Sequence, residues 1–410
     1  MRANPAVATT HAAAVGIPGD ATGGRCPLMP TYAPPTVELV RGEGCYVWDR
    51  EGNRYLDLLC GLAVTSLGHA HPEVTATLAR QASRLVHVSN LFANEHQGPL
   101  AATIDRLIGG GGQVFLANSG AEANECALKL ARKHGGRGRH VVVSAYGSFH
   151  GRTLATLHAT GQPSKHEAFQ PLPEGFRHVA WGDVEALSTA LDPAVAAVLL
   201  EPIQGEGGVV PAPPGYLAAV RELCDDRGML MMLDEVQTGL ARTGDWFAHH
   251  HDGVRPDVVT VAKALGNGVP IGACWARRDV ASCFRPGDHA TTYGGQPLAA
   301  AAARSVLAVM ERERVPERAN RAAARITDAL GGVPGVAGVR GLGLLIAVEL
   351  ADVPAPAVAA ALLDAGVVVN AVTPTALRLA PSLLISDDEI DLAVAAIADA
   401  IAAVAAVGAR

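Results

Sequence analysis

The sequence predicts an α/β fold in which a large domain with a mostly parallel central sheet is joined to a smaller α+β domain built from both chain ends. Between Gln113 and Val261, short apolar runs alternate with helical stretches, a pattern typical of buried parallel strands with helices between them. After about Pro297 the pattern changes to helices that precede strand-like runs. A chain of 410 residues can bury the cores of such a protein without disulfides or metal ions.

The N-terminal part begins with residues 1–30, which are rich in Ala, Gly, Thr and Pro and are predicted to form a flexible tail. Three short β-like runs follow, separated by glycine-containing turns of the kind found in hairpins. They are Val37–Val40, Cys45–Trp48 and Arg54–Leu58. The next segment, Pro72 to Val88, has apolar residues at helical spacing and predicts a helix.

The middle of the chain contains the apolar runs of the predicted sheet, which are Val114–Ala117, Val141–Ser144, Ala197–Leu200, Met229–Leu233 and Val258–Val261. The C-terminal part predicts helices at Leu298–Glu313, Arg318–Leu330 and Asp387–Val407, and strands at Leu342–Glu349 and Val367–Asn370. We therefore expect residues 61–296 to form the large domain and residues 31–60 with 297–410 to form the small one.

Composition and charge exclude several classes of protein. Lys and Arg number 33 against 40 Asp and Glu, and the net charge of −7 argues against nucleic-acid binding. The seven cysteines are odd in number and lack CxxC spacing, so we expect free thiols in a reducing cytoplasm rather than a disulfide framework or a zinc ribbon. The apolar stretch Leu392–Val407 is too short to span a bilayer and contains Asp399. Two short histidine clusters have no acidic or cysteine partner at ligand spacing, so no metal site is predicted.

A strand followed at once by Ser119-Gly120-Ala121 and a good helix former is a candidate phosphate site. Such a turn points unpaired backbone N–H groups and the positive end of the helix dipole at the sheet edge. Gly120 would let a ligand approach the backbone closely. Taken by itself, this segment is better explained by Ser119 acting as an ordinary helix N-cap.

Charged residues also follow two of the predicted strands. Asp234 and Glu235 stand at the carboxyl end of one strand, where α/β sheets place their ligands, although a solvated loop pair is the alternative. Lys263 ends another strand, and a lysine at a buried position has a lowered pKa and can attack carbonyl groups. A Schiff-base lysine, an acid for a pyridinium nitrogen and a helix N-terminus for phosphate are together what pyridoxal phosphate requires.

The chain resembles the class III, ornithine-aminotransferase-like, pyridoxal-phosphate aminotransferases over nearly everything from Tyr32 to Ile397. The segments that carry the resemblance, in the family's order and spacing, are GLAVTSLGHAHP (61–72), ANSGAEAN (117–124), SFHGRT (148–153), ATGQPSK (159–165), LLEPIQGEGG (199–208), LDEVQTG (233–239), AKALGNGVPIGA (262–273), TTYGGQP (291–297) and LRLAPSL (377–383). The resemblance implies the pyridoxal-phosphate-dependent transferase fold of type I. It also implies a homodimer or a dimer-based oligomer with active sites at the subunit interface.

The resemblance further implies roles for individual residues around pyridoxal 5'-phosphate. Lys263 would hold the cofactor as a Schiff base and shuttle the proton, and Asp234 would keep the pyridine nitrogen protonated. Gln237 would bind the phenolic oxygen of the ring, with Phe149 stacked on one ring face and Val236 on the other.

The remaining cofactor contacts come from four segments. Gly120 and Ala121 would give backbone N–H groups to the phosphate, with Ser119 as a further hydroxyl donor. Thr292 would reach the phosphate from the partner subunit. Glu235, beside Asp234, is also predicted among the cofactor-binding residues.

For the substrate, the resemblance implies that Arg152 binds the α-carboxylate and that Arg378 is a second carboxylate-binding arginine. A planar guanidinium holds a carboxylate with two parallel hydrogen bonds, which a lysine cannot do. Glu206 would mask Arg378 while the amino donor presents its far amine, and would release it for glutamate. Thr291 stands where the family usually has Ser and is predicted at the substrate.

The activity so implied is ping-pong transamination of N2-acetyl-L-ornithine with 2-oxoglutarate, giving N-acetyl-L-glutamate 5-semialdehyde and L-glutamate, as in arginine biosynthesis. Leu62 replaces a tyrosine that serves a free amino-acid head group in ornithine aminotransferases, which favours an N-acylated ornithine. Ornithine, succinylornithine, succinyl-diaminopimelate, acetyl-lysine and 4-aminobutyrate stay open as donors. An aminomutase or a decarboxylase on the same fold is a further alternative, and a non-catalytic binding protein is disfavoured because Lys263, Asp234 and Gln237 are all present.

Overall fold

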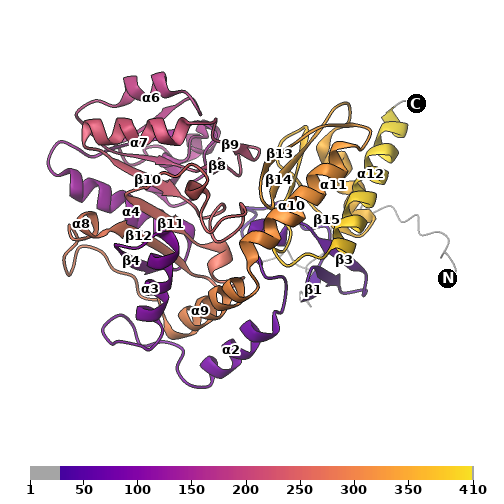
Figure 1. Cartoon of the computed structure of the whole chain (residues 1–410), viewed down its shortest axis with the longest axis horizontal. Helices are drawn as coiled ribbons and strands as arrows, with labels where there is room; N and C mark the ends of the chain where they lie inside the picture. The colour runs from indigo at the N-terminus through magenta and orange to yellow at the C-terminus, as the bar shows by residue number, and fades with distance from the viewer. Residues whose placement is uncertain (1–27, 409–410) are drawn as a thin grey trace.

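The computed structural model describes residues 28–408, so the predicted tail, residues 1–30, lies outside the described residues apart from its last three. Figure 1 shows two lobes side by side. The large lobe contains the elements from α2 to α9, and the small lobe contains β1 to β3 together with residues 315–408.

A seven-stranded sheet forms the centre of the large lobe, with strand order β4-β12-β11-β10-β7-β5-β6. Its strands are β4 (Gly112–Ala117), β5 (Val141–Ala145), β6 (Phe176–Val179), β7 (Val195–Leu200), β10 (Leu230–Asp234), β11 (Val258–Val261) and β12 (Gly272–Arg277). The neighbours from β11 to β6 pair in parallel, whereas β12 runs antiparallel to both β11 and β4. The predicted mostly parallel sheet is confirmed, and all five predicted strands are present in it.

Two strands of this sheet, β6 and β12, are not predicted from the sequence. β12 reads Gly-Ala-Cys-Trp-Ala-Arg and contains none of the β-branched residues that indicate a strand. It also follows a glycine-rich turn. It is nevertheless buried between β4 and β11 because its small side chains fit under α4. β6, at the sheet edge, reads Phe-Arg-His-Val, so two adjacent polar residues interrupt any apolar run.

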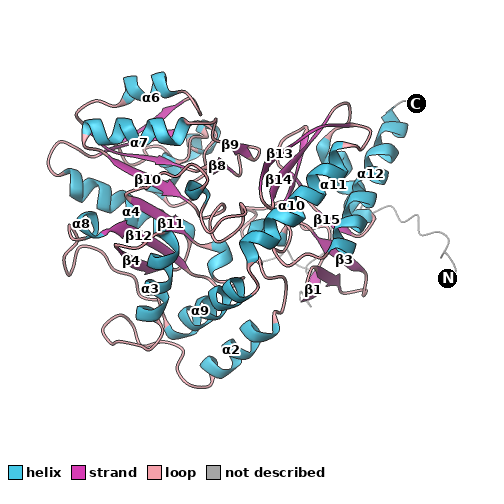
Figure 2. Cartoon of the chain, viewed as in Figure 1, coloured by secondary structure: helices cyan, strands magenta, loops and turns pink. Residues whose placement is uncertain are grey.

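Helices cover the sheet (Figure 2). α4 (Gly120–Gly135) packs across β4, β7, β11 and β12, and α7 (Tyr216–Arg227) packs on β10. The others of this lobe are α2 (Pro72–Ala82), α3 (Gln97–Ile108), α5 (Leu154–Ala159), α6 (Val184–Ala190), α8 (Arg278–Ala281) and α9 (Pro297–Arg312), with 3-10 turns at Pro163–Lys165, Glu167–Phe169, Ala248–His250 and Lys263–Leu265. α9 packs on α2 and α3, so the first helix after the predicted boundary at 297 lies against the large lobe.

The helix predicted over Pro72 to Val88 is shorter than expected. α2 ends at Ala82, where the Gln81 amide Nε2 donates to the backbone carbonyl of Leu85 at 2.8 Å. Leu85 and Val86 are exposed beyond it. The apolar residues at helical spacing therefore continue past the end of α2, but Leu85 and Val86 are not buried in this chain.

The small lobe confirms that both chain ends build one α+β unit. A four-stranded sheet joins β1 (Leu39–Glu43), β2 (Tyr46–Asp49) and β3 (Arg54–Asp57) to β15 (Val367–Val368), which pairs in parallel with β3. A second sheet has the order β13 (Val336–Leu342), β14 (Leu345–Leu350), β17 (Ala376–Leu379) and β16 (Asn370–Ala371). Its helices are α10 (Val315–Gly331), α11 (Ala355–Asp364) and α12 (Asp387–Gly408). The short α1 (Cys60–Ala63) lies between β3 and α2 in the chain. The hairpin of β8 (Ile203–Gln204) and β9 (Val210–Pro211) belongs to the large lobe and contacts β13 of the small lobe.

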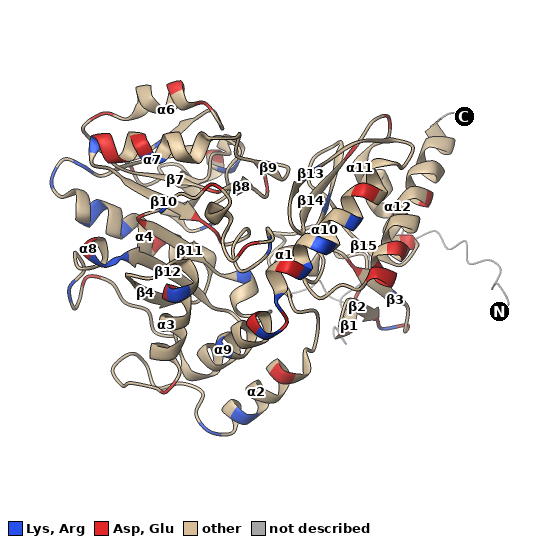
Figure 3. Cartoon of the chain, viewed as in Figure 1, with Lys and Arg blue, Asp and Glu red and all other residues tan. Residues whose placement is uncertain are grey.

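α12 is long and apolar enough to cross a membrane by length and composition alone. Its buried side chains pack instead against α10 and α11, and its first turn carries Asp387, Asp388 and Glu389. Acidic and basic residues are interspersed along the elements of both lobes in Figure 3. These features are those of a helix that covers the core of the small lobe.

A fully buried arginine ties the two lobes together. Arg242 Nη1 donates to the backbone carbonyls of Leu344 at 3.1 Å and Pro381 at 2.7 Å, and its Nη2 donates to Ser66 Oγ at 3.0 Å. Burial lowers the pKa of Arg242 to about 10, and no carboxylate pairs with it among residues 28–408. Its hydrogen bonds to three separate segments offset this cost of burial.

Replacing Arg242 with Ala is expected to lower the free energy of unfolding by about 3 kcal/mol, because three buried acceptors lose their donor at once. Chemical denaturation of the purified protein measures this. Arg325→Ala is the matched control, since Arg325 pairs with Asp391 on the exposed surface and its loss should change the free energy of unfolding far less. Equal losses in the two variants would contradict the assignment of Arg242 as the tie between the lobes.

Candidate active site

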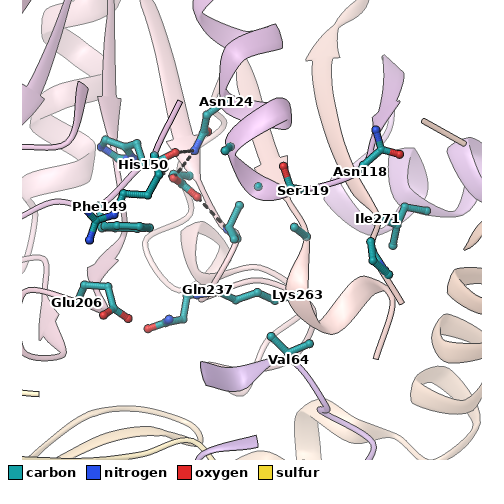
Figure 4. A pocket seen from close by; sticks show the side chains of 18 of the residues that line it. Val64, Asn118, Ser119, Asn124, Phe149, His150, Glu206, Gln237, Lys263 and Ile271 are labelled. Carbon is teal, nitrogen blue, oxygen red and sulfur yellow. Dashed lines mark hydrogen bonds and ion pairs between the residues drawn. The ribbon is translucent and has the colours of Figure 1, made fainter. Parts of the chain in front are cut away.

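A cavity of about 400 Å³ opens where several strands of the large sheet end. β4 leads into Ser119, β5 into the loop of Phe149, β10 ends at Asp234 and β11 leads into Lys263, as expected for the carboxyl ends of parallel strands. Figure 4 shows Phe149, Glu206, Gln237 and Lys263 around the same space. Ten of the predicted site residues line it, namely Ser119, Gly120, Ala121, Phe149, Arg152, Glu206, Asp234, Val236, Gln237 and Lys263.

The N-terminus of α4 forms one wall of the cavity. Ser119 is the N-cap, since its Oγ accepts from the Glu122 amide at 3.1 Å, while Glu122 Oε2 accepts from the Asn118 amide at 2.9 Å. The N-cap interpretation is confirmed, whereas the phosphate site stays a prediction, which the first helical N–H groups beside the cavity support. A Cβ on Gly120 would lie 2.9 Å from the methyl carbons of Val236, so only glycine fits there without displacing that side chain.

Asp234 is held by three donors. Its Oδ2 accepts from Asn124 Nδ2 at 2.7 Å and from His150 Nδ1 at 2.9 Å, and its Oδ1 accepts from the Val236 amide at 3.0 Å. Asn124 in turn accepts from Thr260 Oγ1 at 2.7 Å. This network directs one buried carboxylate into the cavity with its orientation set from three elements.

Asn124 has no role in the sequence-based prediction, although it lies in one of the resemblance segments. It is one helical turn beyond Gly120 on α4, and that spacing places it on the face toward the sheet. A polar residue on an otherwise apolar helix face is the signal that indicates it. Val64, which follows the left-handed turn of α1, and Glu201 also line the cavity without having been predicted to do so.

Lys263 lies on the turn after β11 with a φ of 42°, a left-handed conformation that costs energy for a residue with a Cβ. Burial lowers the pKa of its amine to about 8, with the charge of Glu206 acting against this change and that of Arg378 acting with it. A larger fraction of the amine is therefore neutral near neutral pH than in an exposed lysine.

We expect the rate at which the cofactor-free protein takes up an aldehyde cofactor to rise with pH through about 8, since only the neutral Lys263 amine can attack a carbonyl. The sign follows from the lowered pKa, because the amine gains a proton as the pH falls below that value. Stopped-flow absorbance at a series of pH values measures the rate. A profile that still climbs at pH values near the ordinary lysine pKa of about 10.4 would contradict the expectation.

Glu235 was predicted among the cofactor-binding residues, but its side chain does not line the cavity. Its carboxylate accepts from His249 Nδ1 at 2.9 Å, Thr238 Oγ1 at 2.6 Å and the Ala248 amide at 2.9 Å. Adjacent residues at the end of a strand point to opposite sides, so Asp234 and Glu235 cannot both face the cofactor space. The residue stabilises the loop behind the site.

Glu206, which lines the cavity, pairs with the guanidinium of Arg378, a residue of the other lobe that does not itself line the cavity. Arg378 on β17 is buried, and its Nη1 donates to Glu206 Oε1 at 2.5 Å while its Nε donates to Asn370 Oδ1 at 3.1 Å. Burial raises the pKa of Glu206, but the charge and hydrogen bond of Arg378 outweigh it and bring the pKa below its usual value. The buried Nη2 of Arg378 has no partner among the described residues, which leaves a donor for another carboxylate.

Two further predicted residues, both threonines, do not line this cavity. Thr291 Oγ1 accepts from Asn118 Nδ2 at 3.1 Å, and Thr291 borders a second hollow of about 430 Å³ with Asn90 and Gly294. Thr292 lies in the same segment and does not line the first cavity. Within one chain, therefore, neither threonine reaches the space between Lys263 and Asp234.

Among residues 28–408, no group of three or more His, Cys, Asp or Glu side chains is arranged to hold a metal ion. The histidines that form short clusters in the sequence have other partners. His69 Nε2 pairs with Asp57 Oδ2 at 2.8 Å, and His249 pairs with Glu235.

Known proteins resemble this chain over almost its whole length. Residues 29–401 match the family model described as aminotransferase class-III. An acetylornithine aminotransferase from Corynebacterium efficiens is 50% identical over 385 residues, covering 92% of this chain and 95% of that protein. One from Methanothermobacter thermautotrophicus is 47% identical, covering 90% and 94%.

Solved structures agree with the fold. The ornithine aminotransferase from Toxoplasma gondii has a TM-score of 0.88 at 38% identity, covering 92% of this chain and 93% of that one. The N-acetylornithine aminotransferase from Stenotrophomonas maltophilia has a TM-score of 0.80 at 38% identity, covering 91% and 97%. The two solved structures are equally similar to this chain in sequence, at 38% identity, so they do not separate the two activities. The acetylornithine aminotransferases from Corynebacterium efficiens and Methanothermobacter thermautotrophicus have higher identities, of 50% and 47%. On the match to residues 29–401, this chain belongs to the class-III aminotransferase family.

Proposed function

We propose that this protein transaminates N2-acetyl-L-ornithine with 2-oxoglutarate, using pyridoxal 5'-phosphate. The observation that carries the choice of substrate is the 47 to 50% identity to several acetylornithine aminotransferases over at least 90% of the chain. The ion pair between Glu206 and Arg378 supports this choice. The two amino donors carry their carboxylates at different distances from the reacting amine, so the site needs an arginine that is neutralised for acetylornithine and available for glutamate.

The residues around the cavity fit the cofactor. A volume of about 400 Å³, the α4 N-terminus, a buried carboxylate and a lysine with a lowered pKa provide a place for the phosphate, the ring nitrogen and the aldehyde. When bound, pyridoxal phosphate supplies an electron sink for the carbanion formed at the substrate carbon. Lys263 would hold it covalently, and Gly120 with Ala121 would donate to the phosphate.

The chemistry left to the protein is orientation and proton transfer. Lys263 Nζ would accept the proton from the substrate carbon and deliver it to the carbon that carries the aldehyde in the cofactor, a role that needs an amine able to titrate near the working pH. Asp234, fixed by Asn124 and His150, would keep a negative charge against the ring nitrogen. Phe149 and Val236, which both line the cavity, would hold the two faces of the ring.

Arg152 and Arg378 are proposed to bind carboxylates, with Glu206 as the switch between the two half-reactions. Arg152 lines the cavity with its guanidinium carbon 5.8 Å from the centre of the Phe149 ring. While Glu206 pairs with Arg378, the neutralised pair leaves room for the side-chain amine of acetylornithine. When glutamate enters, its carboxylate takes the place of the Glu206 oxygen on Arg378.

Replacing Glu206 with Gln should speed the glutamate half-reaction relative to the acetylornithine half-reaction by roughly 10-fold, because Arg378 is no longer neutralised. Single-turnover absorbance with each donor measures the two rates separately. Glu349→Gln is a control that breaks the Glu349–Arg340 ion pair, which does not line the cavity. Equal changes in both half-reactions would refute the switch.

The active unit is proposed to be a homodimer or a dimer-based oligomer, located in the cytoplasm. Leu91, Phe92 and Tyr293 expose 86%, 67% and 61% of their surface, and Asn90 Nδ2 donates to the backbone carbonyl of Gly294 at 3.1 Å, so the two segments are adjacent. An apolar patch of this kind is typical of a protein interface. A partner docked on it would bring its own Thr292 toward the cofactor phosphate, which the threonine does not reach within one chain.

An absorption spectrum of the purified, cofactor-loaded protein tests the function. Acetylornithine should bleach the visible cofactor band, and 2-oxoglutarate should restore it. A panel of kcat/KM values for ornithine, succinylornithine, succinyl-diaminopimelate, acetyl-lysine and 4-aminobutyrate then ranks the donors. A donor other than acetylornithine at the head of the panel would overturn the substrate, and turnover without 2-oxoglutarate would indicate an aminomutase or a decarboxylase.

A further inference from the structure

A second buried acid lies beside Asp234 and has no part in the reaction described above. Glu201 directly follows β7 and is 6% exposed, and it lines the cavity. Its Oε2 accepts from the backbone amide of Phe149 at 3.0 Å, and its Oε1 accepts from the backbone amide of Gly205 at 3.3 Å. One carboxylate on a rigid strand end therefore contacts two loops of the site.

The two loops carry different parts of the machinery. Phe149 begins the segment that also holds His150 and Arg152, whereas Gly205 precedes Glu206. A Cβ on Gly205 would lie 1.9 Å from Gln237 Oε1, so this loop presses directly on another cavity residue. A shift of the first loop would therefore move Phe149, and a shift of the second would move Glu206, the partner of Arg378.

We propose that Glu201 is a positioning residue, whose ionised carboxylate holds the Phe149 loop and the Glu206 loop in one arrangement by accepting a backbone N–H from each. A carboxylate can accept both bonds, whereas a protonated acid or an amide places a hydrogen against one of the two N–H groups. The assignment of roles to Phe149 and Glu206 rests on the proposed function. The loop contacts themselves do not.

The surroundings make the ionisation of Glu201 sensitive to pH. Burial raises its pKa to about 7, with the charge of Asp234 acting in the same direction and His150 and the two backbone N–H groups acting against it. Lys263 also faces it from the turn after β11. As the pH falls through this range, Glu201 gains a proton and one of the two loop contacts is lost.

Hydrogen–deuterium exchange of the holoenzyme tests the proposal without depending on turnover. In Glu201→Gln, the amides of residues 147–149 and 204–206 are expected to exchange roughly 10-fold faster, as for the loss of one hydrogen bond. The parent protein should show the same increase between about pH 8 and about pH 6, after correction for intrinsic exchange, and the variant should not. The wild-type pH series keeps the test valid even when the variant fails to fold.

Asp105→Asn is the matched control. Asp105 Oδ1 accepts from the backbone amide of Gly112 and from Trp275 Nε1, both at 2.7 Å, and lies away from the cavity, so its change should affect exchange near Gly112 and Trp275 and not at the two loops. Unchanged exchange at both loops in Glu201→Gln, equal changes in the control, or no pH dependence in the parent protein would each overturn the proposal. Failure of acetylornithine to bleach the cofactor band would instead overturn the proposed function and leave the exchange result intact.

Discussion

Replacing Lys263 with Ala is expected to lower the single-turnover rate with acetylornithine by at least about 10³ to 10⁴-fold. The side chain is the only amine that lines the cavity formed by the described residues, so no other group there can take its role in proton transfer. Stopped-flow absorbance of the cofactor band measures the rate. The fold should survive, since the lysine lies in a left-handed turn that Ala does not strain further.

Two comparisons make this result specific. Lys129→Ala removes an exposed lysine of α4, whose amine bonds to the Asp288 carbonyl, and should leave the rate close to that of the parent. A small primary amine added to Lys263→Ala should restore part of the rate, because it can enter the space vacated by the side chain. Undiminished turnover in Lys263→Ala would refute the mechanism outright.

Asp234→Asn is expected to slow both half-reactions by about 10² to 10³-fold with little change in protein stability. The amide keeps the shape of the carboxylate but carries no charge to hold a proton on the ring nitrogen. His150 Nδ1 and Asn124 Nδ2, which donate to the carboxylate at 2.9 and 2.7 Å, must also share a poorer acceptor. Single-turnover rates with acetylornithine and with glutamate measure the two effects.

The neighbouring acid provides the control for Asp234. Glu235→Gln removes a charge that pairs with His249 behind the site, so it should lower the melting temperature far more than it lowers the rates. Rates in Asp234→Asn that match those of the parent would contradict the role of this carboxylate. A rate loss in one half-reaction alone would also contradict it, since both half-reactions use the same ring.

Much of the site could be predicted from the sequence because its residues follow strands directly. Asp234 and Lys263 end apolar runs, and Ser119 with Gly120 stands between a strand and a helix. Strand ends in a parallel sheet meet at one edge, so local patterns were enough to place these residues together. The resemblance to the family then assigned their roles, which the position of the residues supports.

The partners of these residues could not be predicted in the same way. Asn124 and Asp234 are 110 positions apart, and no local pattern joins them. Arg378 and Glu206 are 172 positions apart and come from different lobes, so their pairing was implied by the family resemblance alone. Glu201 lay inside a resemblance segment but carried no local signal of its two loop contacts. Glu235 was placed at the cofactor by its neighbour, although the alternation of side chains turns it to the other side.

The sequence by itself determined the α/β class, five strands of the central sheet, the contribution of both chain ends to the small lobe and the residues at the strand ends. These follow from apolar periodicity and turn chemistry, which act over a few residues. Only the tertiary structure decided the antiparallel insertion of β12 and the positions of Asn124 and Glu201. These features depend on packing between segments that are distant in the sequence. Hydrogen bonds and close contacts between such segments produce no periodic pattern in the amino-acid sequence.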